Sequence, residues 1–174
     1  KKIIWFRNNL RTHDAAFWKH IQEEDDVVAI FCIEPSWLDK TPYGWKKMEV
    51  FRAQFLLETL SDLKQKLEKS GIAFYVFQET AHQVFKKIHQ VFSFQTIITQ
   101  YEWTSEEVDV EQKIKNEFPK TEWIHTFDQF LIGKRLTKQP NGTRVEINGA
   151  VYFPEGSSAY KTTDINVNLR LPNF

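Results

Sequence analysis

The sequence predicts an α/β fold, a doubly wound five-stranded parallel sheet in the order 3-2-1-4-5 with helices on both faces, followed by a small C-terminal β-meander. Up to about residue 130, short apolar segments alternate with longer segments whose apolar residues recur at helical spacing. Residues 3–6 are a continuous apolar run that stops at Arg7, as in a strand buried on both faces. The hairpin dipeptides Asn141-Gly142 and Asn148-Gly149 then indicate the meander.

Strands and helices are expected in alternation along the first part of the chain. The predicted strands cover residues 3–6, 27–33, 72–77, 96–101 and 122–127. The predicted helices cover about residues 12–24, 47–70, 80–92 and 104–118. Two of these helices begin with a pattern typical of a capping box, Thr80 with Gln83 and Thr104 with Glu107. Crossovers of this length favour right-handed connections between parallel strands.

The longest predicted helix carries one apolar stripe. Its members recur at spacings of three and four and are Phe51, Phe55, Leu56, Leu60, Leu63 and Leu67. Burial of each large side chain contributes roughly 1.5–3 kcal/mol, so the stripe is interpreted as core that needs no partner helix.

The chain divides by composition into two expected domains, residues 1–130 and residues 131–174. In the second, the segments 144–147 and 150–153 flank the turn dipeptides and are interpreted as strands. The last twenty residues are polar and are expected to be extended, and the role of the whole segment is open.

Composition excludes several classes of protein. Lys plus Arg equals Asp plus Glu at 23 each, and this balance argues against a chain that holds nucleic acid by itself. We find no run of basic residues interleaved with aromatics that could grip a single strand. The single Cys32 fits a reducing compartment, so a cytoplasmic location is expected. No apolar run reaches the ~20 residues that span a bilayer.

Sequence motifs predict neither a catalytic residue nor a metal site. Gly-x-Ser-x-Gly, Gly-x-Gly-x-x-Gly and the Gly-Lys-Ser/Thr phosphate loop are all missing from the sequence. His82 and His89 stand seven apart on one predicted helix, which is too little for a metal site without further ligands.

Polar residues gather where the predicted strands end. Arg7, Asn8, Asn9 and Arg11 follow the first strand, Glu34 the second, and Tyr101 and Glu102 the fourth. The first and fourth strands are neighbours at the switch point of a 3-2-1-4-5 sheet, where ligands bind. A crevice lined by Arg7 and Glu102 would suit a planar heterocycle with donors and acceptors. The alternative is that Arg7 and Glu102 form a structural ion pair.

Three stretches carry a resemblance to a known family. Residues 3–14, Ile-Ile-Trp-Phe-Arg-Asn-Asn-Leu-Arg-Thr-His-Asp, resemble the opening of the photolyase/cryptochrome family. Residues 41–44, Lys46 and residues 52–63 are similar to its DASH branch, as are residues 101–107 with 109–111. The resemblance covers residues 2 to about 127 and implies a five-stranded parallel α/β domain.

The resemblance also implies a function. This domain would be the amino-terminal half of a light-driven DNA repair lyase or a blue-light receptor, and it would hold an antenna chromophore. In the family that chromophore is methenyltetrahydrofolate, a deazaflavin or a flavin. A Glu matching Glu102 contacts the pterin in folate-binding members, and residues matching Arg7, Glu34 and Arg52 lie near the ring pocket in the others. Asn9 and Tyr101 complete the expected cofactor-binding set.

The sequence departs from the family pattern at several places. Asn9 and Ala15 stand where the family usually has Asp and Asn, and residues 131–174 match no family segment. In the family, the catalytic FAD and the DNA lesion belong to a helical carboxyl-terminal domain, which we do not find here. The chain alone is therefore expected to be inactive, with that helical domain as its partner and its only route to DNA.

Three functions remain open at this point. The first is the antenna domain of a DASH-type photolyase or cryptochrome. The second is a stand-alone nucleotide- or flavin-binding regulatory module, and the third is an interaction domain without a ligand. The antenna's identity, the choice between repair and signalling, and the oligomeric state do not follow from the sequence.

Overall fold

A computed structural model describes residues 1–127, 134–139, 142–147 and 150–152. The chain forms two compact units, Lys1–Asp128 and Gln129–Phe174. In the first unit, five strands pair in parallel in the order β3-β2-β1-β4-β5, which confirms the predicted sheet. The strands are β1 (Lys2–Phe6), β2 (Val27–Cys32), β3 (Ala73–Phe77), β4 (Thr96–Gln100) and β5 (Glu122–Thr126). The helices are α1 (Val50–Lys69), α2 (Ala81–Phe92) and α3 (Ser105–Glu117), with 3₁₀ turns η1 (Ala16–His20) and η2 (Pro35–Trp37).

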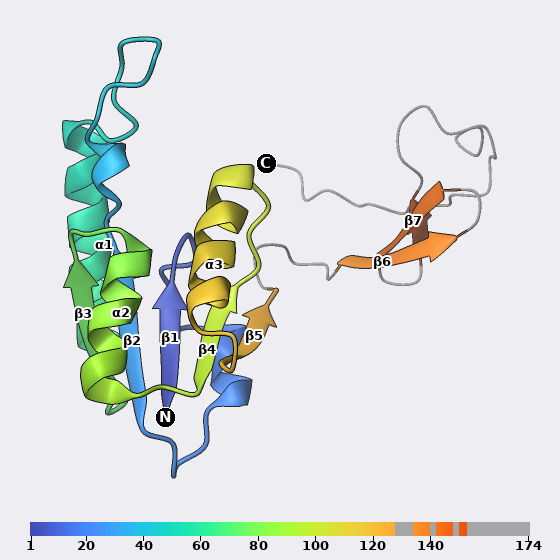
Figure 1. Cartoon of the computed structure of the whole chain (residues 1–174), viewed down its shortest axis with the longest axis horizontal. Coiled ribbons are helices and arrows are strands. Elements are labelled where there is room, and N and C mark those ends of the chain that lie inside the picture. The colour runs from blue at the N-terminus through green and yellow to red at the C-terminus, as the bar shows by residue number, and fades with distance from the viewer. Residues whose placement is uncertain (128–133, 140–141, 148–149, 153–174) are drawn as a thin grey trace, which may run out of the picture. The chain divides into compact units, whose positions relative to one another are not determined.

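The sheet is covered on both faces, as Figure 1 shows. Alternate residues of β1 point to opposite faces, so that Ile4 and Phe6 enter one core and Ile3 and Trp5 enter the other. The first core is closed by α1 and η1, and the second by α2 and α3. Central strand β4 is buried along its whole length, as a strand covered on both faces requires.

Helix α1 is longer than the sheet it covers, and this corrects the predicted apolar stripe. Its 20 residues span about 30 Å, whereas a five-residue strand spans about 17 Å. Leu60, Leu63 and Leu67, in the second half, are buried. Phe51 and Phe55, in the first half, are 87% and 71% exposed, so the prediction that they belong to the core is wrong.

The helix predicted over residues 12–24 is also wrong. Only the short 3₁₀ turn η1 forms there, and Ile21 after it is extended. Asp14 adopts a positive φ of 56°, and Ala15 at the cap position has no side-chain oxygen to accept a backbone N–H. The segment still buries Ala15 and Phe17 in the first core, which explains why its apolar residues resemble a helix face.

The two predicted capping boxes have different outcomes. The backbone N–H of Glu107 donates to the Thr104 hydroxyl at 3.4 Å, and that hydroxyl donates to the Glu107 carboxylate at 2.9 Å. Thr80 makes no side-chain cap at α2; its hydroxyl donates to Gln83 Oε1 at 3.0 Å instead. The first N–H of α2, at Ala81, donates to Glu34 Oε1 at 2.9 Å.

The second unit contains an antiparallel meander in the order β6-β7-β8. Its strands are β6 (Lys134–Gln139), β7 (Gly142–Ile147) and β8 (Ala150–Tyr152). Gln139 pairs with Gly142, and Ile147 pairs with Ala150. Asn141 of the first predicted turn, the second turn at residues 148–149, and the extended tail lie outside the described residues.

Candidate functional site

Arg7 leaves the end of β1 at the edge of the sheet where all five strands end, here called the carboxyl edge. Its guanidinium passes over the Trp5 ring at 4.6 Å and donates from Nη2 to the carbonyl oxygen of Glu107 at 3.0 Å. Its Nη1 lies 3.7 Å from Glu111 Oε2. Burial lowers the pKa of Arg7, and the carboxylates of Glu102 and Glu107 oppose that effect. Groups on helix α3 therefore stabilise the ionised Arg7 guanidinium.

Glu102 follows β4 at the same edge and is only 5% exposed. The side-chain amide of Asn8 donates to Glu102 Oε1 at 3.0 Å and to Glu107 Oε1 at 2.9 Å, so it bridges the two carboxylates. Burial and the charge of Glu107 raise the pKa of Glu102, while Asn8 and Arg7 lower it. The pKa of Glu107 is lowered: burial acts to raise it, but hydrogen bonds from Asn8 and Thr104 outweigh burial. Of these two carboxyl groups, Glu102 thus has the raised pKa and Glu107 the lowered one.

Glu111 extends this cluster beneath α3. Its Oε1 accepts from Lys115 at 2.6 Å and is 2.7 Å from His125 Nε2 on β5. Burial would raise the pKa of Glu111, but these partners bring it down to about 2.

The Tyr101 ring lies 6.0 Å from the His125 ring and 4.6 Å from the Trp103 ring, and it is 43% exposed. An aromatic surface therefore borders the charged cluster.

The structure brings part of the expected set together. Arg7 and Glu102 are close enough for the Glu102 carboxylate to be the largest charge effect that favours the ionised Arg7. The charge of Glu34 also favours the ionised Arg7, and Glu34 and Arg52 each accept or donate a hydrogen bond within the α/β unit. Glu34 caps α2 through the N–H of Ala81, and exposed Arg52 donates from Nη1 to the carbonyl oxygen of Lys47 at 2.9 Å.

Sequence reasoning missed Gln100, the last residue of β4. Its side chain is 1% exposed, and neither its oxygen nor its nitrogen has a hydrogen-bond partner among the described residues. Asn9, which follows β1, likewise has a buried Oδ1 without a hydrogen-bond partner among the described residues. A Gln in the position of a strand residue buried on both faces was the signal that could have identified it.

The cluster offers a heterocyclic ligand three kinds of contact. Glu102 supplies an anionic acceptor, Gln100 supplies an amide with a donor and an acceptor, and Tyr101 supplies an aromatic face. Buried polar groups in native proteins are nearly always paired, so an unpaired amide at a strand end indicates a ligand or an ordered water. The described groups of His, Cys, Asp and Glu do not include a set that could hold a metal ion.

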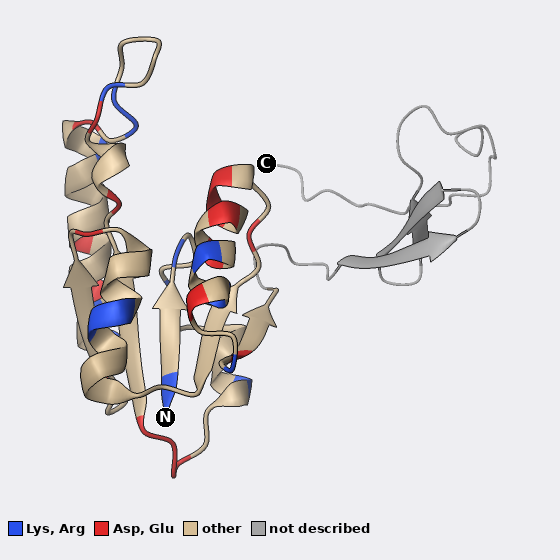
Figure 2. Cartoon of the chain, in the orientation of Figure 1, with Lys and Arg blue, Asp and Glu red and all other residues tan. Residues whose placement is uncertain are grey.

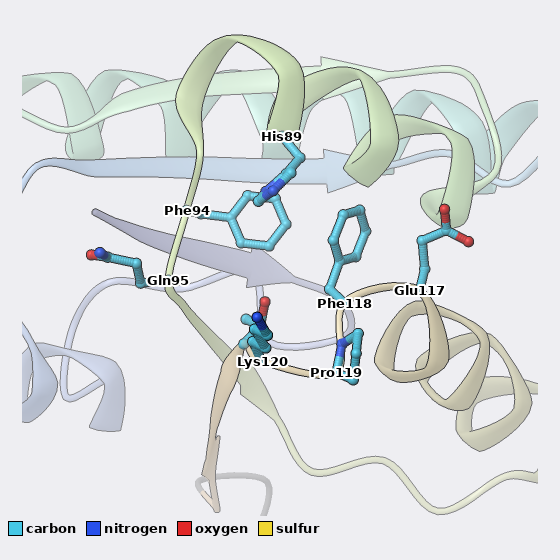
Figure 3. Close-up of a pocket in the computed structure, with 8 residues that line it drawn as sticks. His89, Phe94, Gln95, Glu117, Phe118, Pro119 and Lys120 are labelled. Carbon is cyan, nitrogen blue, oxygen red and sulfur yellow. The ribbon is translucent and has the colours of Figure 1, made fainter.

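A hollow of about 390 Å³ lies at the opposite edge of the sheet, before β4 and β5, and Figure 3 shows its lining. The rings of His89, Phe94 and Phe118 meet there, with centroid distances of 4.8 to 5.3 Å. Phe94 is 2% exposed and belongs to the second core, so these rings close that core at its base. This hollow is separate from the Arg7–Glu102 cluster.

No described helix is long and apolar enough to cross a membrane.

Known proteins are similar to this chain in sequence and in fold. The sequence model of the DNA photolyase family matches residues 2–141. Cryptochrome DASH from Gloeobacter violaceus is 32% identical over 114 residues, which are 65% of this chain and 23% of that protein. The blue-light photoreceptor PHR2 of Arabidopsis thaliana is 30% identical over 114 residues, 65% of this chain and 26% of its own length. The chain spans about a quarter of these relatives.

Solved structures agree with the sequence relatives. The Synechocystis cryptochrome superposes with a TM-score of 0.61 at 26% identity, covering 73% of this chain and 27% of that protein. The archaeal photolyase from Sulfolobus tokodaii, solved with two FAD molecules, matches in fold with a TM-score of 0.60 at 23% identity, over 81% of this chain and 32% of its own. The chain therefore belongs to the DNA photolyase family and corresponds to the amino-terminal α/β domain of its cryptochrome DASH relatives.

Proposed function

We propose that this domain binds an antenna chromophore, methenyltetrahydrofolate or a deazaflavin or flavin, at the carboxyl edge of its sheet. The observation that carries the proposal is the buried Glu102 carboxylate, which lies beside Arg7 at the ends of β4 and β1. This is the switch point of the sheet, where the crossovers on its two sides diverge and leave room for a ligand. The Sulfolobus tokodaii photolyase, which has the same fold, is described with a light-harvesting cofactor, and this supports the same function here.

The residues present fit such a group. A pterin or flavin ring has N–H donors and carbonyl acceptors along one edge, and the Gln100 amide and the Glu102 carboxylate offer the complementary groups. Tyr101 and Trp103 are each 43% exposed and could cover a ring face. When bound, an antenna chromophore absorbs near-ultraviolet or blue light and passes the excitation energy to FAD.

The rest of the function is proposed for a larger protein. A helical FAD domain would complete a light-driven DNA lyase or a blue-light receptor, and this domain would supply it with energy. Asn8 and the α3 carboxylates would hold Glu102 in place. The other proposed chromophore-binding residues are Arg7, Asn9, Glu34, Arg52 and Tyr101.

Titration of the purified chain with each chromophore tests the proposal. We expect retained near-ultraviolet or blue absorbance after gel filtration for at least one of them. Glu102→Gln should weaken that binding by roughly 1.5–3 kcal/mol, because it removes a buried charged acceptor. Glu117→Gln at the other end of α3 is the matched control, since its carboxylate pairs with Lys86 away from the site. Equal affinity of Glu102→Gln and the unmodified chain would place the ligand elsewhere.

A further inference from the structure

The loop between η2 and α1 contains a compact turn with two exposed aromatic rings. The N–H of Thr41 donates to the carbonyl oxygen of Trp45 at 2.7 Å, and the N–H of Gly44 donates to that of Thr41 at 2.9 Å. Gly44 has a φ of +92°, which suits glycine and lets the chain reverse between the two rings. Tyr43 and Trp45 are stacked with centroids 5.5 Å apart, and they are 78% and 63% exposed. We call residues 40–46 the aromatic turn.

Two lysines face each other at the base of the aromatic turn. Lys40 and Lys46 are directly opposite partners in an antiparallel bridge. Like charges at directly opposite positions repel and destabilise a strand pair. In the described part of the chain, neither lysine has an ion pair with an acid, whereas the next residue, Lys47, is paired with Glu106. Figure 2 shows the tip of this loop in tan and its base in blue, with red acidic positions beside the blue ones.

Both features are costly in an isolated protein. The two exposed rings forgo the stabilisation that burial would give, and the opposed lysines repel each other. A ligand that carries flat apolar faces and closely spaced negative charges would relieve both at once. Single-stranded nucleic acid has this chemistry, because its bases stack on aromatic side chains and its phosphates attract lysine.

We propose that the aromatic turn is a contact site for single-stranded nucleic acid, with bases on Tyr43 and Trp45 and phosphates on Lys40 and Lys46. None of residues 40–46 belongs to the proposed chromophore-binding set, so the proposal does not depend on chromophore binding. It departs from the expectation that this chain reaches DNA only through another domain. Balanced total charge hid the site in the sequence, because the two lysines become a local cation pair only when the turn closes.

Fluorescence anisotropy of the complete chain with a labelled oligothymidylate of about twelve nucleotides tests the site. Trp45→Ala should weaken binding about fivefold or more, as expected when one stacked base is lost. The double variant Lys40→Glu with Lys46→Glu should also weaken binding. Across about 50 to 200 mM salt it should reduce the slope of log affinity against log salt by about 1.4, or about 0.7 for each lost phosphate contact.

Lys69→Glu with Lys113→Glu is the matched control. It changes the net charge by the same amount at two exposed lysines outside the turn, and it should leave the affinity unchanged. Near-ultraviolet circular dichroism checks that each variant is folded. Equal weakening by both double variants would reduce the effect to overall charge and overturn the proposal.

Three other outcomes would also overturn it. The unmodified chain could fail to bind the oligonucleotide even at low salt. Thymidine monophosphate could bind as tightly as the oligonucleotide, which would make the site one for a nucleotide and not for a strand. Sedimentation could instead show that the chain self-associates, and that Trp45→Ala abolishes this association without any nucleic-acid binding.

Discussion

Glu111 shows how single side chains hold the carboxyl edge together. It lies between Arg7, which follows β1, Lys115 on its own helix and His125 on β5, and its side chain is 12% exposed. Three cationic or hydrogen-bonding partners offset the cost of burying one carboxylate. The contact fastens α3 to both strands and fixes the helix that also carries Glu107.

The lowered pKa of Glu111 makes stability depend on pH in a defined window. Its ordinary pKa of 4.5 falls to about 2 in the folded chain. A depressed carboxyl pKa contributes stability that is present above the unfolded value and is lost as pH falls through the folded value. We therefore expect the free energy of unfolding to fall between about pH 4.5 and pH 2, with up to about 3 kcal/mol from this residue.

Urea unfolding of the unmodified chain and of Glu111→Gln at a series of pH values measures this effect. Glu111→Gln should be less stable at neutral pH and should depend less on pH within the window. Glu106→Gln is the control, because the Glu106 side chain is 75% exposed and should matter little. Parallel pH curves for the unmodified chain and Glu111→Gln would contradict the prediction.

Helix α1 divides into a half that packs on the sheet and a half that extends beyond it. Leu63 is 1% exposed in the first core, whereas Phe51 is 87% exposed near the start of the helix. Both belong to one apolar pattern in the sequence, but contact with the first core begins at Leu56, after Phe51 and Phe55. We therefore expect the buried leucines of α1 to contribute to the free energy of unfolding and its exposed phenylalanines to contribute little.

This division predicts opposite results for two apolar-to-alanine changes. Leu63→Ala should lower the free energy of unfolding by about 2–5 kcal/mol, because it leaves a cavity in a packed core. Phe51→Ala should change it by less than about 0.5 kcal/mol, as is usual for exposed positions. Urea denaturation of both variants is the measurement, and a large loss for Phe51→Ala would mean that its ring is buried in solution.

For the whole molecule, the described α/β unit provides a scaffold and a candidate chromophore site. The family resemblance implies that a reduced flavin and the DNA lesion lie together in a separate helical domain. Cryptochrome DASH relatives are about four times as long as the segment that matches here.

We therefore expect no photorepair by this chain alone. Illumination with thymine-dimer DNA, FAD and reductant should give no more dimer reversal than a control without protein. Reversal above the control would contradict the assignment of the chemistry to another domain. Oligonucleotide binding at the aromatic turn would not change this expectation, because binding alone does not hold a reduced flavin beside the lesion.

The sequence by itself determined the order of the five strands and of helices α1, α2 and α3, and it placed Arg7 and Glu102 at the same edge of the sheet. Continuous apolar runs predicted β1, β2 and β3, whereas β4 and β5 contain polar residues and were predicted from their place between helical segments. Arg7 follows β1 and Glu102 follows β4, and the 3-2-1-4-5 topology then brings them to one edge. These patterns are local in the sequence, and the parallel topology then places the carboxyl ends of the strands at one edge of the sheet.

Only the tertiary structure decided which side chains are buried and which are paired. Glu34 caps a helix that begins 47 residues later, Phe51 is exposed because its helix outruns the sheet, and η1 forms where a longer helix was predicted. The unpartnered Gln100 and the opposed Lys40 and Lys46 likewise depend on neighbours that only folding supplies. Periodicity records the type of each segment, but burial and pairing depend on where the segments end relative to one another.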